Sequence, residues 1–336
     1  IVWCEVPGGE FIMGETDKYG YGKALKITLQ RFYISKYLVT HTQFQTFLDA
    51  KDGYSNSTWW KDLHVDGFSQ RGQREGQQKW PLANHPREHV SWYDAIAFSR
   101  WLSTKLGYTI TLPTEGQWEK AARGAFGREY PWGNGYQIGF ANIHNEPPSI
   151  TIGPNLVRQT TAVGIYPQGV SPYGIHDLSG NVWEWVLQSR QAHKQYLSDD
   201  DEDNGSYTHL RGGSWKTHAD QASAVYSSFG SAPEDNLSDD VGFRLAIVGT
   251  PSSSPLNLAE PKADKPFFLR ITSDPQRLLA VMLNPEHPPQ ERAEAGREIN
   301  KVGDPRPGVG LRSDGLPDII WCEVPGGEFT MGAAGE

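Results

Sequence analysis

The chain has 336 residues, a formal net charge of -9 and 37% apolar residues, with 12 Trp, 36 Gly and 23 Pro. This composition predicts a globular protein with an aromatic core and many irregular turns. It argues against a nucleic-acid surface, which needs a basic stripe. No apolar run approaches the length of about 18 residues that a membrane span requires. With only two cysteines and no visible leader, we expect a reducing, cytoplasmic location, and secretion or surface display stay open.

Three helices are predicted from their starting signals, in chain order. A hydroxyl side chain can accept a bond from an unpaired backbone amide, and a polar residue three positions later can reach back. These starts are Thr40, Ser91 and Thr114. Apolar residues at helical spacing follow each start, and Gly107 and Gly124 are expected to end the second and third helices.

Strands are expected to be short. Residues 26–34 and 109–112 alternate between apolar and polar side chains, as half-buried strands do. Regular periodicity nearly disappears over residues 124–210. A long irregular stretch in a compact domain needs other support, for which tryptophans and a bound cation are the candidates.

The composition divides the chain into four parts. Residues 1–248 form the main domain, and residues 249–266 are rich in Pro, Ser and charge, which is typical of a linker. Residues 267–303 predict a helical hairpin, which is too small to hold a core alone and should dock on a neighbour. Residues 304–336 lead into a second copy of the opening segment.

The opening segment is repeated near the end of the chain. Residues 1–14 read IVWCEVPGGEFIMG, and residues 319–332 read IIWCEVPGGEFTMG, with two differences. Cys4 and Cys322 are therefore equivalent positions. Because equivalent sites in two copies seldom face each other, we expect both to be free thiols. The repeat also raises the alternative of a module from a larger signalling protein.

Eight segments, in order, resemble the formylglycine-generating enzyme family. They are VPGGEFIMG at 6–14, VTHTQFQTFL at 39–48, HVSWYDAIAFSRWL at 89–102, TLPTEGQWEKAARG at 111–124, YPWGN at 130–134, SPYGIHDLSGNVWEW at 171–185, RGGSW at 211–215 and DDVGFRLA at 239–246. The resemblance implies an α+β, C-type-lectin-like fold with much irregular structure, two main helices and short antiparallel strands. It also implies that calcium is often bound.

The resemblance places a calcium site in SGNVWEW and the residues before it. The positions that match the family's ligands are Asp177, Gly180, Val182 and Glu184. Two acidic side chains and two backbone carbonyls would supply the hard oxygen ligands that calcium takes. The alternative is that Asp177 and Glu184 only cap turns.

The oxidases of this family hold copper(I) with two thiolates, because this soft ion selects sulfur. The resemblance places them three and eight residues after the Ser of RGGS, where this chain has Thr217 and Ala222. No copper is therefore expected, and the chain leans away from being an enzyme. A sulfoxide-synthase branch uses histidine-bound iron, but Pro86 between His85 and His89 disfavours the helix that would align them.

Residues 216–238 lie between two framework segments and combine Tyr and Phe with Ser, Gly and Ala. Rigid aromatic area beside small polar residues is typical of adaptable binding loops. The stretch resembles the hypervariable region of bacterial diversity-generating-retroelement variable proteins. We therefore predict a non-catalytic domain that binds a protein or another macromolecule. The expected contact residues are Trp215, Thr217, His218, Gln221, Tyr226, Ser228, Phe229 and Asn236.

Two alternatives to this hypervariable binding domain stay open. One is a family member that has drifted to bind a single partner or nothing. The other is an oxidoreductase of the formylglycine-generating or sulfoxide-synthase type.

Overall fold

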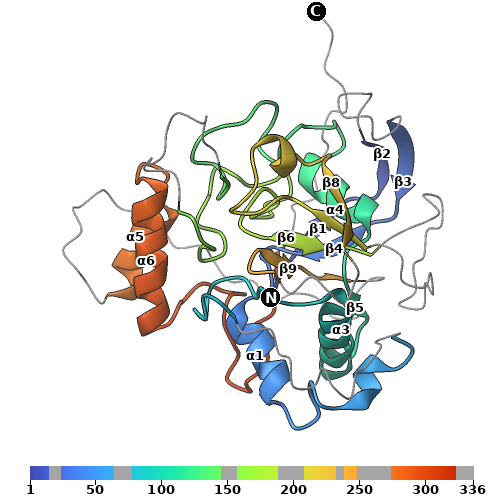
Figure 1. Cartoon of the computed structure of the whole chain (residues 1–336), viewed down its shortest axis with the longest axis vertical. Helices are drawn as coiled ribbons and strands as arrows, with labels where there is room; N and C mark the ends of the chain where they lie inside the picture. Colours follow the sequence, from blue (N-terminus) through green and yellow to red (C-terminus); the bar gives the residue numbers. More distant parts are fainter. Residues whose placement is uncertain are drawn as a thin grey trace, which may run out of the picture.

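The computed structural model describes residues 1–14, 24–63, 78–144, 157–187, 208–231, 238–247 and 274–322. The fold is mixed α+β, with short strands at the centre of the molecule (Figure 1). Helices α1 and α3 lie together at one end, and the hairpin of α5 and α6 lies along one side (Figure 1). No described helix is long and apolar enough to cross a membrane.

Three sheets organise the strands. A five-stranded sheet has the order β11 (Ile320–Cys322), β1 (Val2–Val6), β4 (Phe32–Ser35), β10 (Ala246–Ile247) and β5 (Ile110–Thr111). A two-stranded sheet pairs β2 (Gly9–Met13) with β3 (Leu25–Leu29). A four-stranded sheet has the order β8 (Ser227–Ser231), β7 (Thr208–Arg211), β6 (Trp183–Trp185) and β9 (Val241–Phe243). Most pairs are antiparallel, and β1–β11 and β6–β9 are parallel.

The three helix starts predicted from sequence are confirmed. The helices are α1 (His41–Asp49), α3 (Trp92–Leu106) and α4 (Glu115–Arg123), and each begins with a two-way capping box. Gly107 ends α3 in the left-handed conformation, at φ 77°, and Gly124 ends α4 at φ 69°. Two short 3₁₀ helices, η1 (Ser57–Trp60) and η2 (Asp220–Ala222), also occur.

Aromatic side chains fill the core between α1, α3 and the sheets. Phe44 and Phe98 stack at 5.4 Å between ring centroids, and Phe243 meets both rings edge-on. Phe47 and Trp101 extend this cluster, and all five side chains are almost completely buried. Large aromatic rings bury much apolar area each, so this cluster can stabilise a domain with short strands.

The prediction of one strand over residues 26–34 is wrong. The chain forms β3 and β4 there, separated at residues 30–31, and the two strands belong to different sheets. Phe32 and Ile34 of β4 are buried in the central sheet, whereas β3 forms an outer hairpin with β2. The apolar positions change phase at Gln30 and Arg31, from Ile27 and Leu29 to Phe32 and Ile34, and this shift marks the break.

The first described residues of the second copy lie beside the first copy, contrary to expectation. Strands β1 and β11 pair in parallel and in register, and Cys4 is opposite Cys322. The prediction that equivalent sites would not meet is therefore wrong for the backbone. Cys4 is buried, and its thiol lies 4.0 Å from the Gly174 carbonyl.

The helical hairpin consists of α5 (Pro275–Leu283) and α6 (Pro289–Val302). Its apolar residues form one cluster with Ala162, Ile165 and Tyr166 of the main domain. The structure thus places the hairpin against the irregular region that follows residue 157.

Candidate ligand-binding surface

A tight turn at RGGSW forms the base of the candidate surface. Gly212 and Gly213 both have positive φ, at 90° and 72°. A Cβ on Gly213 would lie 2.7 Å from Thr217 Oγ1 and 3.0 Å from Ala222 Cβ. Thr217 and Ala222 therefore lie next to each other across the turn, and only glycine leaves room between them.

Both positions carry side chains that cannot bind a soft metal ion. Thr217 Oγ1 donates to the Ser214 carbonyl at 3.0 Å and accepts from the Ser214 amide at 2.9 Å. Ala222 is buried and packs with Ala141 and Ile143. A hydroxyl and a methyl group thus stand where the resemblance implies thiolates in the family's oxidases.

The buried side chain of Arg211 holds the RGGSW turn in place. Its guanidinium pairs with the buried carboxylate of Glu119 and donates to the carbonyls of Val225 and Tyr226, at 2.9 and 3.2 Å. It also lies over the Trp118 ring, 5.3 Å from the centroid. The two ends of the segment between β7 and β8 are therefore held by one buried side chain.

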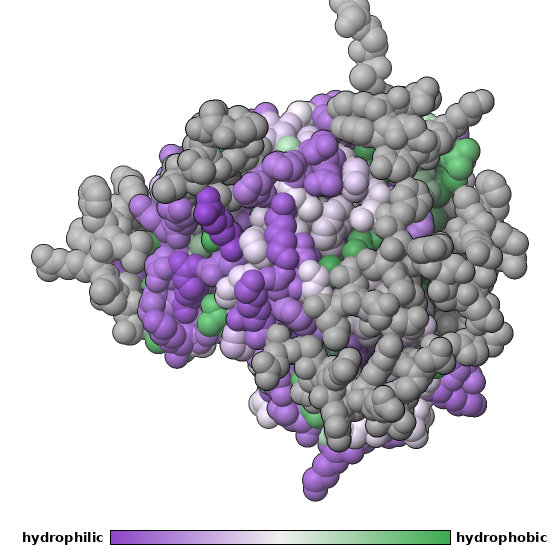
Figure 2. All heavy atoms as spheres, in the orientation of Figure 1, coloured by the Kyte–Doolittle hydropathy of each residue, from purple (hydrophilic) through white to green (hydrophobic). Residues whose placement is uncertain are grey.

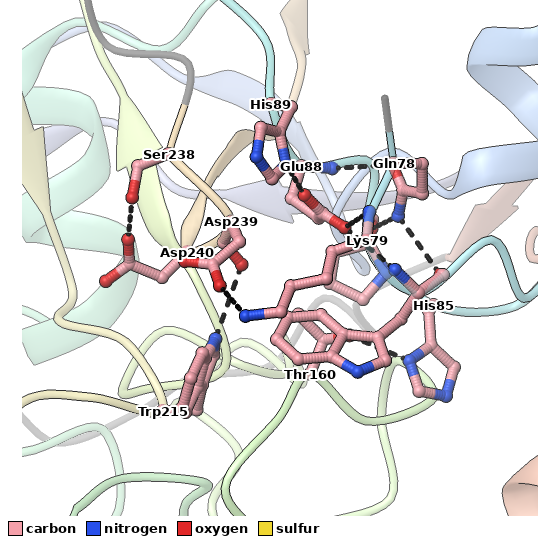
Figure 3. A network of polar contacts seen from close by, with 12 residues as sticks. Gln78, Lys79, His85, Glu88, His89, Thr160, Trp215, Ser238, Asp239 and Asp240 are labelled. Carbon is pink, nitrogen blue, oxygen red and sulfur yellow. Dashed lines mark hydrogen bonds and ion pairs between the residues drawn. The ribbon is translucent and has the colours of Figure 1, made fainter. Parts of the chain in front are cut away.

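Trp215 is part of a polar network that was not predicted from the sequence (Figure 3). Its ring is perpendicular to that of Trp80, with centroids 5.3 Å apart. Lys79 lies over both rings, and Lys216 lies 5.0 Å from the Trp215 centroid. Both lysines pair with Asp239, so residues far apart in the sequence meet here.

The charges of this network are balanced locally. Burial raises the pKa of Asp239, but hydrogen bonds from Lys216 and Lys79 outweigh it and hold the pKa below its usual value. Asp240 accepts from Ser214 at 2.8 Å and also from Ser238. Trp80 was missed because it lies outside the segments with recognisable patterns. A Trp between Lys and Pro was the one signal available.

The other predicted contact residues fall in three environments. His218 is exposed, and its ring lies 5.2 Å from that of His144. Gln221 and Tyr226 are partly exposed, and Tyr226 packs against Trp183 with the ring centroids 6.0 Å apart. Ser228 is partly exposed on β8, opposite Leu210.

Two predicted contacts lie at the limit of the description. The backbone of Phe229 pairs with His209. The Phe229 side chain and the whole of Asn236 lie outside the described residues.

His85 and His89 do not form a metal pair. His85 is fully buried, its Nδ1 lies 2.8 Å from Thr160 Oγ1, and burial lowers its pKa to about 3. His89 has φ 54° and its Nδ1 contacts Glu88 instead (Figure 3). No helix joins the two residues, as Pro86 predicts.

The predicted calcium ligands lie in a buried region around Arg244. Glu184 accepts hydrogen bonds from Arg244 through both carboxylate oxygens, at 2.5 and 2.7 Å, and one from Trp118 at 2.9 Å. Asp177 accepts a bond from the Gly164 amide at 2.7 Å. Burial raises the pKa of Asp177 to about 6 and that of Glu184 above its usual value. As arranged, the Glu184 carboxylate does not fit calcium, because Arg244 already neutralises it.

The two backbone positions of the predicted calcium site lie between these acids. The Gly180 amide donates to the Gly212 carbonyl at 2.8 Å, and the Val182 amide donates to the Gly180 carbonyl at 3.0 Å. Within the described ranges, no three His, Cys, Asp or Glu side chains gather as metal ligands. The calcium site stays a prediction.

The profile of the FGE-sulfatase family, the sulfatase-modifying factor enzyme 1-like domain, matches residues 3–248. The chain belongs to this family. Inactive C-alpha-formylglycine-generating enzyme 2 of Bos taurus is 30% identical over 278 residues, covering 72% of this chain and 86% of that protein. Formylglycine-generating enzyme of Bos taurus is 28% identical over 294 residues, covering 74% of this chain and 75% of that protein.

Solved structures give the same fold. Treponema denticola variable protein 1 superposes with a TM-score of 0.52 at 23% identity, covering 73% of this chain and 94% of that one. PvdO from Pseudomonas aeruginosa has a TM-score of 0.53 at 23% identity, covering 73% of this chain and 93% of that one. At such identities, the likeness shows the fold alone.

Similarity does not separate active from inactive members of the FGE-sulfatase family. A relative named as an enzyme and one named as inactive have nearly the same identity to this chain. The distinction must come from individual residues, above all from the positions beside Gly213.

Proposed function

We propose that this FGE-sulfatase domain is a non-catalytic recognition protein. One observation carries the proposal. Thr217 and Ala222 keep the adjacency that two copper-binding thiolates would need, but they supply a hydroxyl and a methyl group. Because copper(I) prefers sulfur ligands, we expect no copper(I) to bind at these two positions. A relative named as an inactive enzyme is consistent with this proposal.

The recognition surface would combine two segments around the RGGSW turn. Trp80 and Trp215 offer partly exposed aromatic area, and the neighbouring lysines and Asp239 offer charge. His218 and Tyr226 extend this surface along the 216–238 segment. Aromatic anchors beside adaptable polar groups suit a protein or another macromolecule. The fold shared with Treponema denticola variable protein 1 supports a variable protein of the retroelement type.

The first test asks whether the protein does copper chemistry. Purified protein is titrated with copper(I) against a chromogenic chelator and is then incubated with a cysteine-containing peptide and oxygen. We expect no stoichiometric copper binding and no peptide oxidation. Tight copper binding with turnover would replace the proposal with the oxidoreductase alternative.

The second test locates the binding surface. A displayed peptide library is selected on the wild-type protein, and the enriched binders are measured on His218→Ala. A remote histidine at the α5–α6 turn, changed in His287→Ala, is the matched control. We expect at least a tenfold loss of affinity for His218→Ala alone. Equal binding by both variants would place recognition elsewhere.

A third test concerns variation in the 216–238 segment. We expect the neighbouring DNA to encode a reverse transcriptase and an adenine-rich near-copy of these codons. Their absence would leave a recognition domain with one fixed partner.

A further inference from the structure

Residues 274–318, which we call the clasp, cover one side of the domain. Apolar residues of α5 and α6 are buried against it, whereas the outward face of the hairpin is hydrophilic (Figure 2). The buried residues are Leu278, Leu279, Met282, Ala293, Ala295 and Ile299. This division between the two faces is that of an amphipathic element docked on a partner surface.

Polar contacts fix the position of the hairpin. Arg292 is 1% exposed and donates to the carbonyls of Ile165 and Gly139, at 2.7 and 3.1 Å. Asn84 donates to the Gly296 carbonyl at 3.0 Å. A Cβ on Gly296 would lie 2.9 Å from Ala162 Cβ, so the helix meets the domain closely there.

The rest of the clasp runs to the start of β1. Thr40 donates to the Val309 carbonyl and Gln43 to the Gly308 carbonyl, both at 2.9 Å. A Cβ on Gly308 would lie 2.2 Å from Val2 Cγ2. The clasp therefore contacts the cap of α1 and the first residues of β1.

The chain that follows the clasp is a second copy of the strand that the clasp touches. Residues 319–332 repeat residues 1–14, and β11 pairs with β1 in register. The clasp thus lies beside one copy of this strand in space and is joined to the other copy in sequence.

We propose that the clasp is an exchangeable docking element whose partner is a second copy of this domain. Within one chain, residues 248–273 are the covalent link from the domain to the clasp. The same surfaces can therefore meet between two chains without any change in their bonds, as in domain swapping. The proposal is independent of what the RGGSW surface binds.

The first experiment separates the clasp from its domain. A protease site is inserted within residues 249–266 of the full chain, and the cut protein is analysed by size-exclusion chromatography. We expect the two pieces to co-elute. Separate elution of a folded domain would overturn the proposal, because a docking element must bind without the covalent connection.

A matched pair of variants tests the contact itself. Arg292→Ala removes the bonds to Ile165 and Gly139, whereas Arg297 on the same helix pairs with Glu294 of that helix. In the cut protein, we expect Arg292→Ala to release the clasp at least tenfold faster than Arg297→Ala. Equal rates would contradict docking through Arg292.

The second experiment asks for exchange between chains. Gly296→Glu damages the clasp and leaves the domain surface intact, and Ala162→Glu does the reverse. We expect each variant alone to be monomeric, whereas their mixture forms a 1:1 dimer in which one intact clasp binds one intact surface. A mixture that stays monomeric while both variants are folded would overturn exchange. Arg297→Glu in place of Gly296→Glu should form no dimer.

Discussion

Two residues beside the RGGSW turn stand where the resemblance implies copper ligands. Thr217 and Ala222 are adjacent, so cysteines at both positions should bring two sulfurs together. We expect Thr217→Cys combined with Ala222→Cys to bind one copper(I) ion, measured by chelator competition. Each single variant is the control and should bind at least tenfold more weakly. Equal affinity of the double variant and the wild type would show that these positions do not govern copper binding.

The buried carboxylates give a second residue-level prediction. If Asp177 and Glu184 hold calcium as the resemblance implies, EDTA should lower the melting temperature, and added calcium should restore it. Asp177→Asn should abolish this dependence while keeping an acceptor for the Gly164 amide. An unchanged melting temperature in EDTA would leave Arg244 and Trp118 as the partners of Glu184 and would remove the calcium hypothesis.

Glu115 gives a pH-dependent prediction. Burial raises its pKa, but hydrogen bonding with His209 and the charge of Arg211 outweigh it and lower the pKa to about 2. The ionised group therefore stabilises the fold above pH 4.5, and this contribution is lost as pH falls towards 2. We expect Glu115→Gln to lower the free energy of unfolding at pH 7 by up to about 3 kcal/mol.

Urea denaturation between pH 7 and pH 3 measures the effect of Glu115→Gln. The deficit should shrink as pH falls below 4.5. Glu10→Gln is the control, since the ion pair of Glu10 with Lys26 is exposed. A deficit independent of pH would contradict the role of the charge.

At the level of elements, the turn between β7 and η2 depends on Gly213. Any side chain there meets Thr217 and Ala222 and must also adopt positive φ. We expect Gly213→Ala to cost about 2 kcal/mol in the free energy of unfolding, measured by urea denaturation. Gly310→Ala, with no atom within 4 Å of its Cβ, should cost far less. Similar costs at both sites would contradict the close approach at Gly213.

Elements with local signals could be predicted from sequence, and those fixed by distant contacts could not. The caps at Thr40, Ser91 and Thr114 act within four residues, and all three were predicted. The phase shift at residues 30–31 marks the end of β3, but the pattern does not encode that β3 and β4 join different sheets. The site divides in the same way. RGGSW could be recognised as a motif, whereas Trp80 belongs to the surface only through its tertiary contact with Trp215.

For the whole molecule, the scaffold brings together segments that lie far apart in the sequence. The parallel pair β6–β9 holds the end of SGNVWEW next to the GFR segment. The buried Arg244–Glu184 ion pair connects the same two segments across the core. Asp239 is thereby held close to the RGGSW turn, where both lysines reach it. The candidate surface is thus a product of the framework rather than of the 216–238 segment alone.

This view predicts that Trp80 and Trp215 act as one unit. We expect the effects of Trp80→Ala and Trp215→Ala on the free energy of unfolding to be coupled by about 1 kcal/mol, because each variant removes the same edge-to-face contact. Urea denaturation of the two single variants and the double variant measures this coupling. Trp132, which stacks on Tyr130 at 5.0 Å, provides a control pair, since Trp80→Ala and Trp132→Ala should be additive. If the Trp80 and Trp215 effects also add, the two segments do not form a common surface, and recognition would be confined to the 216–238 segment.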